Sequence, residues 1–205
     1  LIPVTGILRI YSGDVANSCH TAQHNELAKG LSGVHAFIYA ENEGTPREAI
    51  RGSSLMIEAT QRGTKTPVLV ARAMNPKENF ISSLSSDAVD PNSLVKQSLK
   101  GVIQGARNLR TRRMQGSDCP DHLKQQCVAM PYDAAGQSST NRKGVNEAMH
   151  NLLTSAAPKI DLENTPETNF NGYTIWSSTG FYPCRVIWSI DENGVETWYT
   201  NEQLV

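Results

Sequence analysis

The sequence has no excess of charge of either sign, because 19 lysines and arginines stand against 20 aspartates and glutamates in 205 residues. This balance argues against a protein that binds nucleic acid through bulk positive charge. Long apolar runs are also missing, and none reaches the roughly 20 residues that a membrane-spanning helix requires. Hydrophobic residues still make up 39% of the chain. That fraction excludes disordered and collagen-like proteins and predicts a globular protein with a buried core.

Cysteine is scarce, with four residues in the chain: Cys19, Cys119, Cys127 and Cys184. An even number suits two disulfides in an oxidising compartment, although four reduced thiols are equally compatible with a protein of this size. Cys119 and Cys127 bound a short polar segment that contains Pro120, and their spacing predicts a disulfide between them. Cysteine usage thus favours a secreted protein. The chain starts at Leu1, as expected of a processed mature form or an excised fragment.

Secondary-structure signals divide the chain into three blocks of one domain spanning residues 1–205. The N-terminal α/β half, 1–84, alternates strand and helix patterns. Its predicted strands cover 6–12, 34–40 and 66–74. Its predicted helices cover 21–31 and 45–61, and the second starts with Thr45 as N-cap, Pro46 at the first helical position and Glu48 completing a capping box.

The second block, 85–157, is a predicted helical insertion. Asp90-Pro91 begins a helix whose apolar residues recur every three or four positions, at Val95, Leu99, Val102, Ala106 and Leu109. Four arginines cluster near its C-terminal end: Arg107, Arg110, Arg112 and Arg113. They fit a solvated helix end, where cations offset the helix dipole, or a site for an anion or an acidic partner. A second helix is predicted over 144–155.

The C-terminal half, 158–205, is predicted to be mainly β. Two strand patterns, 185–190 and 195–199, flank Asn193-Gly194, a dipeptide typical of a tight hairpin turn with positive φ at both residues. Together the three blocks predict an α+β fold. We expect a split, twisted sheet built from the first and last blocks, with the helical insertion packed on it.

Histidines near Cys19 allow two kinds of site. His20 and His24 stand four residues apart, a spacing that zinc sites use on a helix, with Cys19 or His35 as further ligands. Cys19 and His35 would alternatively form the nucleophile and base of a thiol protease. Polar surface histidines explain the same pattern, so we assign no metal.

Two short motifs resemble those of other families. Trp188 and Glu192 match the W-x-x-x-E signature of bacterial effectors that act as GTPase exchange factors, but here the motif runs from a strand into a turn. Residues 44–48 resemble the G-T-x-x-E stretch of nucleoside deoxyribosyltransferases, in which a glutamate on a helix is the nucleophile. The next strand begins about two helical turns too far along the chain. This class of N-glycosidic-bond enzyme is a distant alternative.

A broader resemblance covers the first and last blocks. Residues 7–12, Ile-Leu-Arg-Ile-Tyr-Ser, place an arginine on a predicted strand, and 28–33, Ala-Lys-Gly-Leu-Ser-Gly, end a short helix. A strand over 37–40, a helix and a strand ending in Asn75-Pro76 follow, and 179–187 form a Gly-Phe-Tyr-Pro turn that leads into a strand. This order is similar to that of the mono-ADP-ribosyltransferase toxins of the cholera and pertussis type.

The resemblance implies a function and a set of site residues. The chain would be a secreted toxin or effector that transfers ADP-ribose from NAD to a protein of a host or competitor cell. Arg9, Ser12 and Tyr39 would bind NAD, and Glu167 would be the catalytic carboxylate that stabilises the oxocarbenium-like ribose. The strand facing the nicotinamide has Tyr39-Ala40-Glu41 where the family has Ser-Thr-Ser. The alternative is a catalytically inactive secreted binding protein on the same scaffold.

Overall fold

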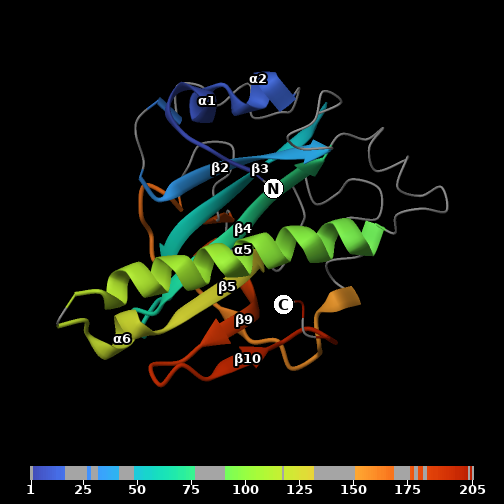
Figure 1. Cartoon of the computed structure of the whole chain (residues 1–205). Coiled ribbons are helices and arrows are strands. Elements are labelled where there is room, and N and C mark those ends of the chain that lie inside the picture. Colours follow the sequence, from blue (N-terminus) through green and yellow to red (C-terminus); the bar gives the residue numbers. More distant parts are fainter. Residues whose placement is uncertain are drawn as a thin grey trace.

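The computed structural model describes residues 2–16, 27–28, 32–41, 49–76, 91–116, 118–131, 151–168, 176–177, 180–181, 184–202 and 204. Their main feature is an open, eight-stranded sheet (Figure 1). Its main path runs β1 (Ile2–Val4), β2 (Val34–Glu41), β3 (Ala49–Thr60), β4 (Pro67–Pro76), β5 (Gln126–Pro131), β9 (Cys184–Ile190), β10 (Glu196–Trp198). The short β6 (Lys159–Ile160) pairs with β9, and β7 (Trp176–Ser177) pairs with β8 (Gly180–Phe181) in a separate two-stranded sheet.

Neighbouring strands are antiparallel except β4 and β5, which are parallel. Parallel neighbours need a crossover connection, and α5 (Pro91–Met114) lies in that connection. Strands from the first and last blocks of the chain therefore form one sheet, with α5 of the middle block packed on it (Figure 1). The middle block, predicted as a helical insertion, also supplies β5 to the centre of this sheet. The expected α+β class is confirmed as a mostly antiparallel open sheet with a few helices.

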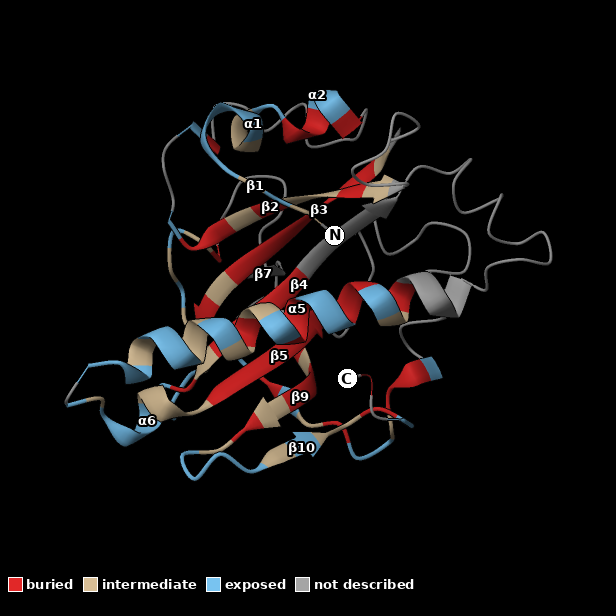
Figure 2. Ribbon diagram, viewed as in Figure 1, coloured by how far each residue is buried: buried red, intermediate tan, exposed pale blue. Residues whose placement is uncertain are grey.

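Helix α5 begins at Pro91, as its Asp90-Pro91 start predicts. The predicted apolar stripe faces the sheet, and its members Val95, Leu99, Val102 and Ala106 are each at most 3% exposed. They share one core cluster with sheet residues that include Met56, Leu69, Val128 and Trp188. Figure 2 shows the buried positions of α5 alternating with exposed positions on its outer side. Burying each aliphatic side chain contributes about 1.5–3 kcal/mol, so this stripe holds the helix on the sheet.

The opposite face of the sheet has a core of its own. Side chains alternate between the two faces along a strand, and Ile57 and Val70 accordingly pack away from α5, with Ala129, Leu162 and Val186. Two short helices, α1 (Gly6–Ile10) and α2 (Ser12–Ala16), contact β2 and β3. The short α6 (Asp121–Lys124) contacts α5. The sheet is thus covered on both sides.

Two predicted elements of the N-terminal half are wrong. Residues 6–12, predicted as a strand, form α1 and the start of α2, and β1 precedes them. Residues 45–61, predicted as a helix, contain β3 from Ala49 onward. Leu55, Met56 and Ile57 are consecutive and fully buried, which fits a central strand covered on both faces rather than an amphipathic helix. Pairing with β2 and β4 thus outweighs the local capping signal.

The C-terminal hairpin is confirmed, but its turn differs from the prediction. Strands β9 and β10 pair antiparallel, with Ile190 opposite Glu196. Gly194 has a φ of +87°, whereas Asn193 has no positive φ. The amide of Gly194 donates to the Asp191 carbonyl (3.1 Å), and the Asp191 carboxylate accepts the amides of Asn193 (2.9 Å) and Val195 (2.8 Å). Asp191 therefore organises a longer turn that needs a positive φ only at Gly194.

The predicted Cys119–Cys127 disulfide is also wrong, because both thiols are free. Cys127 lies in β5 and packs in the core opposite α5, where burial raises its pKa to about 11. Cys119 lies before α6 and is half-buried. Strand pairing directs the Cys127 side chain into the core. Most of the predicted helices 21–31 and 144–155 lies outside the described residues.

Candidate functional site

Two adjoining cavities lie where the β1–β2 edge of the sheet meets α1 and α5. The first has a volume of about 240 Å³ and is lined by β1, Arg9 of α1 and the start of β2. The second, of about 210 Å³, lies between β2–β3 and the C-terminal half of α5. Pro3, His35 and Phe37 line both cavities. We call the two cavities together the β1–α5 cleft.

A histidine–carboxylate pair lies at this cleft. His35 of β2 stands opposite Met56 of β3, two residues before Glu58, and His35 Nε2 lies 2.6 Å from Glu58 Oε1. Both side chains are partly exposed, at 36% and 40%. The hydrogen bond from His35 lowers the pKa of Glu58, and the charges of His35 and Arg113 act in the same direction against the opposing effect of burial. Glu58 is therefore ionised at neutral pH.

Three of the four clustered arginines form hydrogen bonds that hold elements of the fold together. Arg107 donates to both carboxylate oxygens of Glu196 (2.9 and 2.7 Å). Arg110 and Arg113 donate to backbone carbonyls, which include those of Asp191 (3.3 Å) and Leu123 (3.2 Å). These contacts tie the end of α5 to the turns that flank β5 and β9. These three residues therefore form neither the solvated helix end nor the anion site that the sequence suggested.

Arg112 differs from the other three arginines. Its side chain is exposed, lines the second cavity and makes no hydrogen bond or ion pair with the part of the chain that the structure describes. A guanidinium presents several N–H donors in a planar fork that matches phosphate and carboxylate oxygens. The cleft thus has a cation available for an anionic ligand at its α5 side.

Glu167 lies close to the same pair. It belongs to a turn at 166–168 that is anchored by the buried Thr168, whose Oγ1 donates to the Glu163 carbonyl (3.0 Å). A Cβ atom placed on Gly33 would lie 2.9 Å from Glu167 Cγ and 3.2 Å from Glu58 Cβ. Glu58 and Glu167 therefore flank Gly33, one residue before β2.

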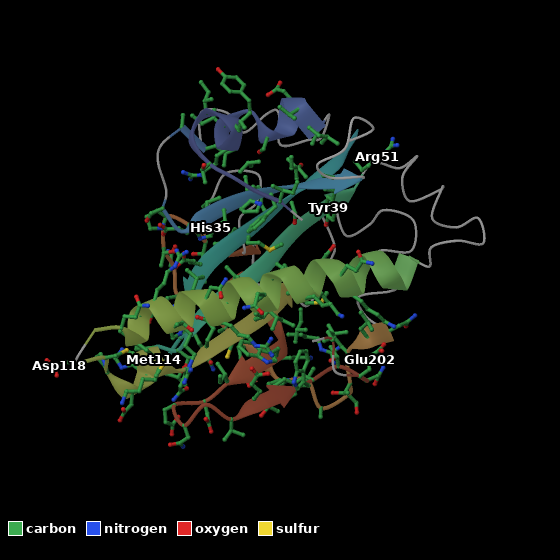
Figure 3. The ribbon with its side chains drawn as sticks, in the orientation of Figure 1. His35, Tyr39, Arg51, Met114, Asp118 and Glu202 are labelled. Atoms are coloured by element: carbon green, nitrogen blue, oxygen red, sulfur yellow. The ribbon has the colours of Figure 1, made fainter. Side chains whose placement is uncertain are left out.

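The four residues assigned from the resemblance do not gather in one place. Arg9 lines the first cavity with His35. Ser12 is buried and donates to the Arg9 carbonyl (3.0 Å). Tyr39 is buried, accepts a hydrogen bond from Ser98 of α5 (3.5 Å), and has a pKa raised to about 12 by burial. His35 and Tyr39 lie toward opposite ends of β2 (Figure 3), and neither Ser12 nor Tyr39 lines the cleft.

With this geometry in view, the chain can be compared with known proteins. No family model, curated protein or solved structure matches it.

The sequence did not point to Glu58, and it did not distinguish Arg112 from the three arginines beside it. Glu58 fell inside a predicted helix, and it meets His35 only through the pairing of β2 with β3. The arginine cluster did point to an anion site, but only the fold separates Arg112 from its neighbours. Within the described ranges, no group of three or more His, Cys, Asp or Glu could hold a metal ion, and no helix is long and apolar enough to cross a membrane. Cys19, His20, His24 and Glu48 lie outside these ranges.

Proposed function

We propose that the β1–α5 cleft binds NAD and that the chain transfers ADP-ribose from it to a protein. The observation that carries this proposal is that Arg9 and His35, the partner of Glu58, line one cavity. Arg9 would meet the phosphates of NAD in this cavity, and His35 would connect the cavity to the ionised carboxylate of Glu58. A secreted toxin or effector that modifies a host or competitor protein would use this chemistry.

Arg9 would bind the diphosphate of NAD. Guanidinium donors match phosphate oxygens bidentately, which an ammonium group does not. The cavity that Arg9 lines is bordered by β1 and the start of β2, so NAD would lie along the sheet edge toward Phe37. The aromatic ring of Phe37 offers a stacking surface for a planar ring of the ligand.

The carboxylates would act at the ribose. In the transfer, the bond between the nicotinamide nitrogen and ribose C1′ breaks, and C1′ forms a bond with a nucleophilic atom of the target protein. An ionised carboxylate stabilises the positive charge that develops on the ribose. Glu167 is the carboxylate that the resemblance assigns, and Glu58 lies on the other side of Gly33 with a lowered pKa.

Calorimetry with NAD tests the binding step. Wild-type protein should give heat of binding, Arg9→Lys should abolish it without lowering the melting temperature, and the control Arg62→Lys should bind as wild type does. Arg62 is exposed and lines neither cavity. No binding at millimolar NAD would refute the proposal.

Nicotinamide release tests the chemical step. Glu167→Gln should bind NAD normally and lose turnover. With the ribose beside the His35–Glu58 pair, Glu58→Gln should also bind NAD normally and lose nicotinamide release. Binding without release in wild type would instead support the non-catalytic binding protein, a role favoured by the burial of Ser12 and Tyr39 outside the cleft.

A further inference from the structure

The half of the cleft on the α5 side has features that NAD binding through Arg9 does not use. Its walls are apolar and come from four elements: Phe37 of β2, Met56 of β3, Leu69 of β4 and, across from them, Leu109 of α5. Arg112 lies at its exposed side and His35 on its sheet side. We call this second cavity the α5 groove. It combines a hydrophobic wall, one available cation and a histidine that is held by a carboxylate.

The hydrogen bond to Glu58 sets the role of each His35 nitrogen. An ionised carboxylate only accepts hydrogen bonds, so Nε2 carries the proton that bridges to Glu58 Oε1 across 2.6 Å. In the neutral imidazole the other nitrogen, Nδ1, is then a proton acceptor. A carboxylate that fixes the tautomer and orientation of a histidine prepares it to act as a general base. Such a histidine activates hydroxyl or water nucleophiles.

The charges around the groove select the ligand. Arg112 is exposed and unpaired among the described residues, whereas Arg113 donates to Leu123, Gln125 and Gln126. The Glu58 carboxylate is bonded to His35, and Glu167 lies beside Glu58 across Gly33, so their charges repel a ligand with two negative charges. One guanidinium and two nearby carboxylates therefore favour a monoanionic phosphodiester over a dianionic phosphomonoester. The apolar wall fits an ester with an aromatic or heterocyclic group.

We propose that the α5 groove binds such a phosphodiester and that His35 acts as the general base for its hydrolysis. A water molecule gives a proton to His35 Nδ1 while its oxygen forms a bond to phosphorus. The bond between phosphorus and the leaving oxygen breaks, and that oxygen takes the electron pair and then the proton from His35. The products are a phosphomonoester and an alcohol. Arg112 holds the nonbridging oxygens, and Glu58 is a positioning residue that fixes His35.

The test uses bis(p-nitrophenyl) phosphate, with EDTA present, and follows release of p-nitrophenolate. His35→Gln should lower kcat about 100-fold, within the usual contribution of general base catalysis. Arg112→Gln should raise KM about 10-fold with little change in kcat, since it removes a binding contact. Glu58→Gln should lower kcat and leave KM unchanged, which a purely structural role would not do. Arg62→Gln serves as the matched control, with wild-type kcat and KM expected.

Arg112→Gln keeps the test decisive even if His35→Gln fails to fold, because Arg112 is exposed. Absence of p-nitrophenolate release above the buffer rate would overturn the proposal. Wild-type rates in folded His35→Gln, or a wild-type KM in Arg112→Gln, would overturn it as well. The result is independent of NAD binding, since calorimetry with NAD reports on Arg9 and diester hydrolysis reports on Arg112.

Discussion

A single glycine, Gly33, lies between the side chains of Glu58 and Glu167. Gly33 is buried and precedes β2, and its backbone carbonyl accepts the amide of Glu58 at 2.7 Å. The space that a side chain would need at this position is occupied by Glu167 and Glu58. The absence of a Cβ at Gly33 therefore lets the 166–168 turn approach the β2–β3 pair.

We expect Gly33→Ala to destabilise the protein by about 1–3 kcal/mol, the usual cost of overpacking. The added methyl would lie 2.9 Å from Glu167 Cγ, so Glu167→Ala should relieve part of the loss in the double variant. Urea denaturation measures both effects. Gly105→Ala in α5 is the control and should be neutral or stabilising by up to about 1 kcal/mol, since its Cβ would meet only Leu69 at 4.0 Å. A Gly33→Ala variant as stable as wild type would contradict the packing described here.

Glu58 should make stability depend on pH in the acid range. Its pKa in the folded protein lies below the ordinary value of 4.5, mainly because of the hydrogen bond from His35. The unfolded chain therefore binds the proton first, and the stabilisation is complete above pH 4.5 and is lost as the pH falls through the folded pKa. Glu58→Gln should lower the free energy of unfolding at pH 7 and have progressively less effect below pH 4.5. An equal effect at pH 7 and pH 3 in urea titrations would count against this pairing.

At the scale of elements, α5 is held by its apolar stripe and by its C-terminal arginines. Arg107 forms a two-point contact with Glu196 of β10 and lies over the ring of Trp188, 5.5 Å from its centroid. Trp188 is fully buried, and its indole N–H donates to the same Glu196 (3.0 Å). Glu196 therefore joins the helix, β9 and β10 at one point.

Glu196→Ala should cost about 2 kcal/mol, because it leaves the buried indole N–H of Trp188 without an acceptor. Glu196→Gln keeps an acceptor oxygen and should cost less. Arg107→Ala should cost about 1 kcal/mol, and the double variant should show a coupling of similar size. Thermal unfolding, followed by tryptophan fluorescence, measures these differences. Additive effects of the two alanine substitutions would show that the contact does not stabilise the fold.

The β9–β10 turn gives a second prediction at this scale. A Cβ on Gly194 would meet no atom within 4 Å, so only its φ of +87° opposes a side chain. Gly194→Val should therefore lower stability by about 1–3 kcal/mol through backbone strain, and Gly194→Asn should lose less. Gly116→Ala, at a glycine without positive φ, is the control. An unchanged melting temperature in Gly194→Val would place the turn elsewhere.

At the scale of the whole molecule, the described cysteines are not cross-linked. Cys127 and Cys184 are buried in the core opposite α5, and Cys119 is half-buried outside it. The predicted cross-link between Cys119 and Cys127 therefore plays no part in the described fold. The two-sided core around the sheet holds the described fold together.

Thiol labelling checks this arrangement in a Cys19→Ser variant, which leaves three cysteines. Cys119 should react first with a thiol reagent in the folded protein, and Cys127 and Cys184 should react only after unfolding, since burial raises the pKa of Cys127 to about 11. Mass spectrometry of the labelled protein without reduction identifies the sites. A disulfide that links Cys119 to Cys127 would contradict the structure.

Several elements follow from local sequence alone. The Asp90-Pro91 start and the spacing of Val95, Leu99 and Val102 predict α5, because a helix buries residues that recur every three or four positions. Runs of β-branched and aromatic residues predict β2 and β4, and Asn193-Gly194 locates the C-terminal hairpin. In each of these cases the local preference and the tertiary packing favour the same structure.

The tertiary structure decided what depends on distant partners. β3 is a strand because β2 and β4 satisfy its backbone and two cores bury its side chains, although its sequence begins with helix signals. His35 and Glu58 are 23 positions apart and meet only through strand register. The arginines of α5 look equivalent in sequence. Only the packing of α5 against α6, β10 and the turn after β9 gives Arg107, Arg110 and Arg113 their partners, while Arg112 lines the groove. Local chemistry specifies elements, but a cleft is assembled from residues that only the fold brings together.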